Sequence, residues 1–273
     1  MGGLISYIST SVFHQTNTKP DLRSNVPLPS TIHAIIQPSI IKNRALFIVG
    51  DVHGCYDEMR ELLEKAKNAT PKEMTVVFVG DLVNKGPKNK QVLDYVQESG
   101  AYSVRGNHDN AVLYQCLSYQ SDTNYEVSAR YEWICDLSQE NIDYLRDLPY
   151  TIKIPSHNVI IVHAGLLPGK PLEHQNLSDM IVMRNVIDRD YFDGGPYASE
   201  IAGGSPWIRY WGGKDHIYFG HDAVRGLQQS TFATGLDTGC VYGGCLTGVF
   251  VNESGEIDSM LQVKAKDVYK PVS

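Results

Sequence analysis

Five short apolar stretches of this 273-residue chain each end in polar residues that can bind a metal ion or move a proton. The side chains that follow these stretches are two carboxylates, one amide and three imidazoles: Asp51, His53, Asp81, Asn107, His163 and His221. Ligand sites in α/β folds lie beyond the carboxyl ends of the strands, so we expect these six side chains to meet in one crevice. Their mixed oxygen and nitrogen donors favour manganese, iron, zinc or cobalt over magnesium or calcium.

The number of donors indicates two metal ions. Six protein ligands are too many for one tetrahedral zinc that keeps an open position. They are about right for two divalent ions roughly 3.5–4 Å apart that share a carboxylate and a hydroxide. Such a pair neutralises a phosphate group and lowers the pKa of bound water toward neutrality. The pattern therefore predicts a dinuclear metal site.

Alternating strands and helices must position these residues. Apolar runs predict strands over residues 45–49, 75–79, 102–104, 159–162 and 217–219, and a closing hairpin over 245–251 and 257–263. Helical spacing predicts helices over residues 56–67, 89–98, 110–119 and 139–145. Residues 190–216 are rich in glycine and aromatics and are expected to form long loops. The alternation predicts one α/β domain over residues 45–273, preceded by an extended, proline-broken arm over residues 1–44.

Five motifs resemble those of the calcineurin-like metallophosphoesterases. They are GDVHG (50–54), GDLVNKGP (80–87), RGNHD (105–109), VHAG (162–165) and GHD (220–222), in the order of that family. The resemblance runs from about residue 45 to residue 251. GDLVNKGP, GHDAVRGLQ (220–228) and GLDTGCVYGG (235–244) look most similar to the ApaH-like phosphatases, the branch related to bacterial symmetrical dinucleoside tetraphosphatase. The resemblance implies a central β-sandwich flanked by helices, with a dinuclear metal site at the carboxyl-terminal ends of the strands.

The resemblance also implies a role for each site residue. Asp51 and His53 would hold the first ion, and Asp81 would bridge both ions. Asn107, His163 and His221 would hold the second ion. His108 would protonate the leaving oxygen, while the cations that grip phosphate oxygens would be Arg105, Lys85 and Arg184. The implied cofactors are two divalent ions, with manganese favoured and iron, zinc or cobalt as alternatives.

Two departures separate this chain from the phosphoprotein phosphatases of the same superfamily, which carry G-D-x-V-D-R-G and G-N-H-E. Asn84 and Lys85 replace the Asp-Arg pair, and Asp109 replaces the Glu. These departures count against a protein serine/threonine phosphatase. They leave open what orients His108 and which cation replaces the arginine. Lys85 is the candidate for the second role, as a point charge and not a planar fork.

The favoured function is hydrolysis of phosphoanhydride bonds by a metal-bridging hydroxide, in dinucleoside polyphosphates, inorganic polyphosphate or nucleotide-capped RNA. The motifs do not separate these three substrates. The first alternative is a phosphoprotein serine/threonine phosphatase. The second is a non-catalytic phosphate-binding scaffold, which the intact set of six ligands and His108 disfavours.

The composition limits the partners. Lys and Arg number 24 against 31 Asp and Glu, for a formal net charge of −7, so the chain has no general electrostatic footprint for nucleic acid. This mildly favours a small phosphorylated substrate or polyphosphate. Five scattered cysteines without a C-x-x-C pair exclude a zinc finger and favour a reducing, cytoplasmic compartment, with Cys240 and Cys245 as buried thiols.

The N-terminus carries a lipidation pattern. Met1-Gly2-Gly3-Leu4-Ile5-Ser6 matches M-G-x-x-x-[ST], the pattern for N-myristoylation of Gly2. One acyl chain gives only weak, reversible membrane association. No apolar run reaches the roughly 18 residues of a transmembrane helix. The oligomeric state stays open.

Several other residues could have either a structural or a functional role. Trp207 and Trp211 either stack on nucleobases or pack a loop, and packing is favoured. Arg225 is expected to close a loop rather than to reach substrate. Asp222 is a candidate acceptor for a ligand histidine. Arg184 either grips phosphate or is a solvated helix residue.

Overall fold

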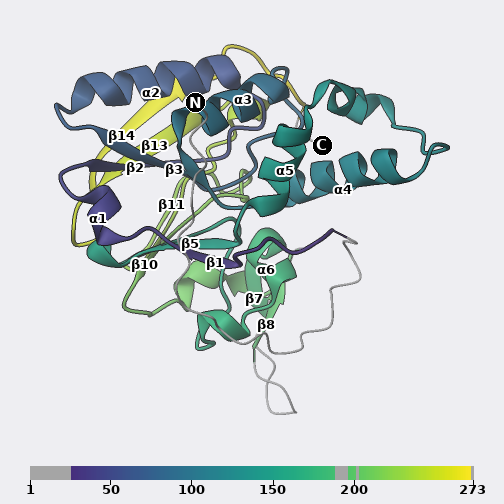
Figure 1. Cartoon of the computed structure of the whole chain (residues 1–273). Coiled ribbons are helices and arrows are strands. Elements are labelled where there is room, and N and C mark those ends of the chain that lie inside the picture. Colours follow the sequence, from purple (N-terminus) through teal and green to yellow (C-terminus); the bar gives the residue numbers. More distant parts are fainter. Residues whose placement is uncertain (1–25, 188–195, 201–202, 272–273) are drawn as a thin grey trace.

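The apolar runs of the chain form two β-sheets that pack face to face, with helices on both outer faces (Figure 1). This computed structural model describes residues 26–187, 196–200 and 203–271. The expected Gly2 lipidation site lies outside the described residues. No helix in the described ranges is long and apolar enough to cross a membrane.

The first sheet has five strands and carries the first half of the motifs. Its order is β14 (Ile257–Lys264), β13 (Cys245–Val251), β2 (Ala45–Val49), β3 (Met74–Phe78) and β4 (Tyr102–Ser103). Strands β2, β3 and β4 run parallel, and β13 is antiparallel to both of its neighbours. The carboxyl ends of β2, β3 and β4 therefore lie at the same edge.

The second sheet has six strands. Its order is β1 (His33–Ile35), β5 (Thr151–Ile154), β6 (Val159–Val162), β10 (His216–Phe219), β12 (Ala233–Gly235) and β11 (Gln228–Gln229). Strands β6, β10 and β12 run parallel, so their carboxyl ends also meet at one edge. A small antiparallel sheet of β7 (Asn185–Ile187), β8 (Tyr197–Ser199) and β9 (Ser205–Pro206) lies below it in Figure 1.

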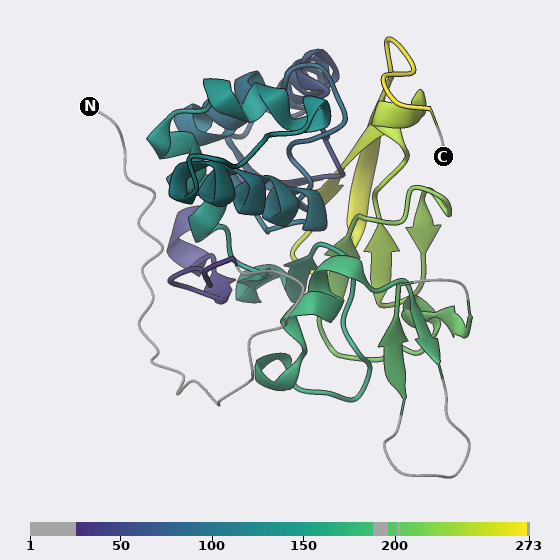
Figure 2. The ribbon, with the colours of Figure 1, turned by 90° about the vertical axis from the view of Figure 1, so that its right-hand side faces the viewer.

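The helices bury the outer faces of both sheets. The five-stranded sheet is covered by α2 (Tyr56–Ala69), α3 (Asn89–Ser99), α4 (Asn107–Ser121), α5 (Gln139–Asp147) and the 3₁₀-helix η1 (Ala129–Asp136) (Figure 2). The six-stranded sheet packs on α6 (Leu177–Val182) and on the 3₁₀-helix η4 (Trp207–Arg209). Between the sheets lies a third apolar layer, which includes Ile48, Val77, Ile161 and Tyr218. This is the sandwich that the family resemblance implies.

Strands β8 and β9 and the 3₁₀-helix η4 lie within residues 190–216, which were expected to form loops. Three further local features differ from the expected elements. Residues 33–41, within the expected arm, form β1 and the short α1 (Pro38–Ile41), and β1 pairs in parallel with β5. The folded unit therefore begins before residue 45. Helix α4 begins at Asn107 and not at residue 110, because Gly106 in extended backbone starts the helix there. Helix α6 ends at Val182, so Arg184 is not a helix residue.

Candidate metal centre

The carboxyl ends of both sheets bring together the six donors that the sequence singles out. Asp51 and His53 follow β2, Asp81 follows β3, and Asn107 opens α4. His163 follows β6 and His221 follows β10. All except Asn107 have 8% or less of their surface exposed. The donors thus lie where two parallel sets of strands end.

The turns that present these side chains are strained. His53, Asp81 and His221 have φ values of 48°, 50° and 69°, in the left-handed region that non-glycine residues rarely adopt. Asn84 and Lys85, in the turn after Asp81, have φ values of 76° and 74°. Each such residue costs of order 1–3 kcal/mol, so the surrounding contacts must hold these turns in place.

Asn107, His163 and His221 form one donor group. Asn107 Oδ1 lies 3.0 Å from His163 Nε2 and 3.0 Å from His221 Nδ1. The opposite ring nitrogens face backbone carbonyls, with His163 Nδ1 2.9 Å from Val79 O and His221 Nε2 3.0 Å from Val182 O. Each ring therefore carries its proton on the carbonyl side and turns a lone pair toward Asn107 Oδ1. Two ligand atoms bound at about 2.1 Å and at a right angle lie about 3.0 Å apart, so this spacing fits a shared cation.

Asp51, His53 and Asp81 form the other donor group. His53 Nδ1 lies 3.3 Å from Val83 O, which leaves Nε2 to face Asp81 Oδ2 at 3.4 Å. Asp81 Oδ1 lies 3.5 Å from His163 Nε2 on the opposite side. One carboxylate thus reaches both donor groups. Asp51 accepts the backbone N–H of His221 on both carboxylate oxygens, at 3.2 and 3.1 Å.

The charges of this site are unbalanced without a cation. Burial raises the pKa of Asp81 to about 7, and burial together with Asp237 and Asp81 raises the pKa of Asp51 well above its usual value. Burial lowers the pKa of His163 to about 4 and also depresses the pKa values of His53 and His221. The imidazoles are therefore neutral acceptors, and the carboxylates need positive charge to ionise. Two divalent ions fit this donor set and would supply that charge.

Two further carboxylates belong to the site and have no role in the sequence interpretation. Asp109 accepts the backbone N–H groups of Asp81, Gly106 and Val83, at 2.8, 2.9 and 3.3 Å. It thereby fixes the turn that carries Asp81. Asp237 follows β12, is buried, and accepts the N–H of Gly239 at 3.1 Å. Both stand in quoted motifs, RGNHD and GLDTG, and the position of Asp237 after a parallel strand was the available signal.

Asn84 orients His108. Asn84 Oδ1 accepts the backbone N–H of Lys85 at 2.9 Å, so its amide NH₂ faces His108 Nδ1 at 2.9 Å. The amide donates, His108 Nδ1 accepts, and the imidazole proton lies on Nε2. Burial, aided by Lys85, lowers the pKa of His108 to about 2, so the ring is neutral. This answers which group replaces the Asp of the phosphoprotein phosphatases at that position.

Lys85 reaches into the site. Its Nζ lies 3.0 Å from His53 Nε2, and 5.3 Å from the centre of the Tyr242 ring. The ammonium therefore stands at the nitrogen lone pair that the resemblance assigns to the first ion. Lys85 Nζ and an ion bound to His53 Nε2 cannot both occupy this position.

The two arginines differ in accessibility. Arg105 is fully buried, and its guanidinium donates to the carbonyls of Pro27 and Arg146 and to Asn110 Oδ1. The structure does not bring it to the donor groups, and its contacts are those of a group that holds chain segments together. Arg184 lies at the rim, where Nη2 donates to His221 O at 3.3 Å and Nε lies 3.7 Å from Asp222 Oδ1. Arg184 keeps 30% of its side-chain surface exposed.

The remaining candidates have structural contacts. Trp207 is buried against Phe219, and its indole N–H donates to Ala164 O at 3.0 Å, as expected of a packing residue. Arg225 bonds Asp222 and closes the loop after His221. Asp222 does not contact the imidazole of His221, whose Nε2 faces a backbone carbonyl instead. The expectation that Asp222 orients a ligand histidine is therefore wrong.

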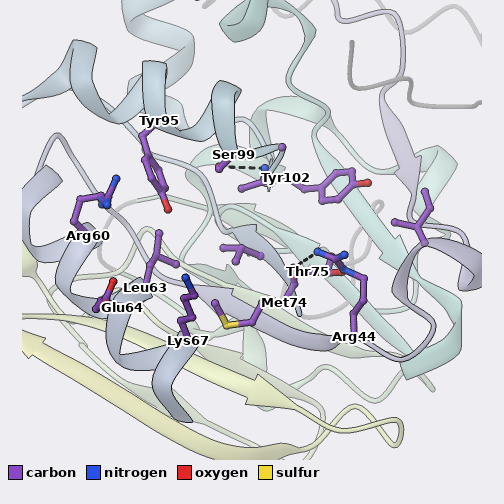
Figure 3. Close-up of a pocket in the computed structure, with 14 residues that line it drawn as sticks. Arg44, Arg60, Leu63, Glu64, Lys67, Met74, Thr75, Tyr95, Ser99 and Tyr102 are labelled. Atoms are coloured by element: carbon purple, nitrogen blue, oxygen red, sulfur yellow. Dashed lines mark hydrogen bonds between the residues drawn. The ribbon is translucent and has the colours of Figure 1, made fainter. Parts of the chain in front are cut away.

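A separate cavity of about 420 Å³ lies at the opposite end of the strands (Figure 3). Its lining includes Arg44, Met74 and Thr75, which stand at the amino ends of β2 and β3, together with Arg60 and Tyr95 from α2 and α3. Arg44 Nε donates to Thr75 Oγ1 at 3.0 Å, as the dashed line in Figure 3 marks. This cavity has no part in the metal centre.

A sandwich whose parallel strand ends hold carboxylates, an amide and imidazoles fits a metal-dependent phosphoesterase. Residues 45–230 match the family model described as calcineurin-like phosphoesterase. The chain belongs to this family and is a hydrolase of phosphoric ester or anhydride bonds that uses divalent metal ions.

Several relatives cover most of both chains. The asymmetrical bis(5'-nucleosyl)-tetraphosphatase PrpE of Bacillus subtilis is 26% identical over 223 residues, which cover 74% of this chain and 88% of that protein. The symmetrical bis(5'-nucleosyl)-tetraphosphatase of Janthinobacterium is 28% identical and covers 82% and 98%. The zinc-dependent endopolyphosphatase of Saccharomyces cerevisiae is 26% identical and covers 88% and 87%.

Solved structures show the same fold. A crystal structure of a protein assigned as a diadenosine tetraphosphatase aligns with a TM-score of 0.74 and 34% identity, over 86% of this chain and 98% of that one. A serine/threonine phosphatase from Saccharomyces cerevisiae aligns with a TM-score of 0.52 at 16% identity, over 89% and 86% of the two chains. The second likeness concerns the fold alone.

Proposed function

We propose that this enzyme hydrolyses phosphoanhydride bonds of small or linear polyphosphates, with dinucleoside polyphosphates, inorganic polyphosphate and nucleotide-capped RNA as the substrate classes. Two divalent ions, when bound, would neutralise the phosphate and activate the attacking water. Asp51 and His53 would hold one ion, and Asn107, His163 and His221 the other, with Asp81 between them. The relatives named as tetraphosphatases and as an endopolyphosphatase support anhydride substrates.

The observation that carries the proposal is the contact between Asn84 and His108. A carboxylate at position 84 would accept a proton from Nδ1 and would stabilise a charged imidazolium. An amide N–H that donates to Nδ1 does the opposite, because a protonated ring would place two N–H groups against each other. His108 is thereby kept neutral and is a weak acid that donates from Nε2.

A weak acid suits a phosphate leaving group. A phosphate monoanion loses its second proton at a pKa of about 6, so a departing phosphate needs little help from a proton donor. A serine or threonine alkoxide is close in basicity to hydroxide, whose conjugate acid has a pKa of about 15.7, and needs a strong acid. The neutral His108 therefore supports anhydrides over phosphoprotein esters.

Lys85 and Arg184 would bind the phosphate chain. Both lie within reach of the donor groups, on opposite sides, with Lys85 beside His53 and Arg184 beside His221. Cations placed around the equatorial oxygens stabilise the charge that develops during displacement at phosphorus. Arg105 would contribute to phosphate binding only indirectly, by holding the segment that carries Asn107 two residues further on, because its own guanidinium is buried.

The metal pair is proposed to be manganese, with zinc, iron or cobalt as the alternatives. The oxygen and nitrogen donors accept all four. A zinc-dependent relative shows that zinc serves in at least one member of this group. Reloading the metal-free enzyme with each ion in turn and measuring kcat separates these alternatives.

A substrate panel tests the proposal. Mn²⁺-loaded enzyme is given diadenosine tetraphosphate, long-chain polyphosphate, nucleotide-capped RNA and a phosphoserine peptide, and released products are measured. Anhydride cleavage that Asp81→Asn and His108→Asn both reduce supports the proposal and selects the substrate class. Activity on the phosphopeptide alone would establish the serine/threonine phosphatase alternative. Two bound ions without cleavage of any substrate would favour a phosphate-binding scaffold.

The cellular placement is a separate proposal. We infer a cytoplasmic enzyme with weak membrane association through N-myristoyl Gly2, from the pattern Met1–Ser6. Coexpression with an N-myristoyltransferase should add one myristoyl group by mass spectrometry. Vesicle binding should then appear, and Gly2→Ala should abolish both the added mass and the binding.

A further inference from the structure

Two buried thiols and a buried carboxylate form a second cluster, separate from the six donors of the metal centre. Cys55 immediately precedes α2, Glu58 lies in its first turn, and Cys240 begins the 3₁₀-helix η5 (Cys240–Tyr242). Their exposed fractions are 1%, 0% and 2%. The two sulfurs and a carboxylate oxygen all lie within 4.8 Å of one another. None of these three groups has a role in the proposed phosphate chemistry.

The carboxylate of Glu58 is only half used. Its Oε1 accepts the backbone N–H of Lys266 and the hydroxyl of Tyr269, both at 2.8 Å. Its Oε2 is buried and has no hydrogen-bond partner. Buried polar atoms are normally paired, and an unpaired carboxylate oxygen beside two thiols needs an explanation.

We propose that Cys55, Glu58 and Cys240 bind a zinc ion, separate from the two catalytic ions. Thiolate sulfur and carboxylate oxygen are zinc ligands, at about 2.3 Å and about 2.0–2.2 Å. Two sulfurs on one tetrahedral ion lie about 3.8 Å apart, a spacing that falls within the 4.8 Å limit of the observed cluster. The set supplies three protein ligands and leaves the fourth position of the tetrahedron open. Soft thiolates select zinc over manganese, so the two kinds of site would differ in preference.

A disulfide between Cys55 and Cys240 is the competing explanation for the paired thiols. The two sulfurs lie within 4.8 Å of each other, which both explanations accommodate. A disulfide would leave Glu58 Oε2 buried without a partner, whereas a cation would pair it. The observations therefore favour the ion.

The location gives this ion a structural consequence. Cys55 lies two residues after His53, and Cys240 lies three residues after Asp237 of the catalytic centre. Glu58 in turn holds the C-terminal segment through Lys266 and Tyr269. An ion here would tie together the turn after β2, the loop after β12 and the C-terminus. Loss of the ion should loosen the turn that presents His53.

Cobalt substitution tests the proposal without reference to activity. The enzyme is stripped with a chelator under reducing conditions and titrated with Co²⁺. The dinuclear centre offers only oxygen and nitrogen donors, so thiolate-to-cobalt charge-transfer absorption in the near ultraviolet reports thiolate ligands and not that centre. We expect this absorption, with a total of three bound ions per chain. Zinc should displace the absorption and manganese should not.

Variants assign the signal. Cys55→Ser and Cys240→Ser should each abolish the charge-transfer absorption, and Glu58→Gln should weaken cobalt binding by about tenfold or more. Cys116→Ser removes another buried thiol and should leave the absorption intact. The visible absorption of cobalt in the dinuclear centre reports that each variant is folded.

Two results would overturn the proposal. One is the absence of charge-transfer absorption while the dinuclear centre fills with cobalt. The other is a Cys55–Cys240 disulfide, found by mass spectrometry in protein purified without reductant, together with the binding of only two ions per chain after that disulfide is reduced. Neither result bears on the phosphoanhydride proposal, which depends on the other donor groups.

Discussion

Asn84 donates a side-chain hydrogen bond to His108 Nδ1 at 2.9 Å, and this one contact sets the proton on the opposite ring nitrogen. Asn84 is itself held by Lys85, whose backbone N–H bonds its Oδ1. Asn84 stands in the left-handed backbone region, with φ 76°, where asparagine and aspartate are tolerated better than most residues. The turn that carries the cation Lys85 therefore also sets the tautomer of the proposed acid.

Asn84→Asp should shift specificity from anhydrides toward esters. The new carboxylate accepts a proton from His108 Nδ1 and raises the pKa of the imidazole, so a charged acid forms near neutral pH. We expect the ratio of kcat/KM for a phosphoserine peptide over diadenosine tetraphosphate to rise by about tenfold. The ester activity should fall again as pH rises through the new pKa of His108.

Two variants control that experiment. Asn84→Gly keeps the left-handed backbone and removes the side chain, so it should lower both activities without changing their ratio. His108→Asn in the Asn84→Asp background should remove the gain on esters. An unchanged ratio in Asn84→Asp would show that residue 84 does not set the acid strength of His108.

Lys85→Met should weaken substrate binding and leave the metals in place. The change removes the charge near His53 Nε2 and keeps the length of the side chain. Loss of one cation that binds phosphate should lower kcat/KM by about 10–100-fold. The catalytic centre should still bind two metal ions. Steady-state kinetics and metal analysis measure the two effects.

Lys90→Met is the matched control for Lys85→Met. Lys90 pairs with Asp94 one turn along α3, with 41% of its side chain exposed. It should change neither kcat/KM nor metal content. If Lys85→Met released a metal ion with no change in KM, the ammonium would be a support for the ligands and not a phosphate clamp.

Arg105→Met should affect folding more than catalysis. The fully buried guanidinium satisfies the carbonyls of Pro27 and Arg146 and the side chain of Asn110. Leaving buried acceptors without a donor should lower the free energy of unfolding by roughly 2–4 kcal/mol. Denaturant unfolding measures this loss. At temperatures where the variant is folded, KM for diadenosine tetraphosphate should stay within about twofold of wild type.

The opposite result would restore Arg105 as a phosphate ligand. A large rise in KM with unchanged unfolding free energy would mean that the segment at Pro27 moves aside and exposes the guanidinium. Arg209→Met, a change of an exposed arginine on the 3₁₀-helix η4, serves as the control for removing an arginine.

The strand-end residues were accessible to sequence reasoning, whereas the burial of Arg105 was not. Asp51, Asp81 and His163 each follow an apolar run, and parallel pairing necessarily places such residues at one edge. Arg105 also follows a strand, β4, but its direction depends on α5 and on the segment at Pro27, which come from distant parts of the chain. No local pattern contains that packing.

The role of Asn84 shows the same limit within the site. Its replacement of an aspartate was visible in GDLVNKGP, but its partner lies 24 residues away and its orientation depends on the backbone of Lys85. The edge strand β1 was missed for a related reason. Three residues, His33–Ile35, carry too little periodicity to predict a strand, and pairing with β5 defines it.

Metal binding should release protons at mildly acid pH. Burial raises the pKa of Asp81 to about 7 and of Asp237 to about 6, so the metal-free centre holds protons that an ionised unfolded carboxyl would have lost. The buried imidazoles have lowered pKa values and are already neutral. Affinity for Mn²⁺ should therefore rise with pH up to about 7, with at least about one proton released at pH 6.

Calorimetry in buffers of different ionisation enthalpy measures this release. Asp237→Asn should reduce the number of protons released and keep two bound ions, since Asp237 is not among the six donors. An affinity that does not change between about pH 5.5 and 7.5 would mean that these carboxyl groups are ionised before the metal arrives.

Gly220→Ala should disrupt the donor group of Asp51, His53 and Asp81 by a steric effect alone. A Cβ atom at residue 220 would lie 1.9 Å from Asp51 Oδ1, and the backbone cannot yield easily because Gly220 N–H donates to His163 O at 2.7 Å. The carboxylate of Asp51 must move, so we expect loss of one bound ion and a fall in kcat of about 10²-fold or more. Metal analysis and kinetics measure both. Gly212→Ala meets no atom within 4 Å and should change neither quantity, and retention of both ions in Gly220→Ala would show that Asp51 is not required to bind a cation.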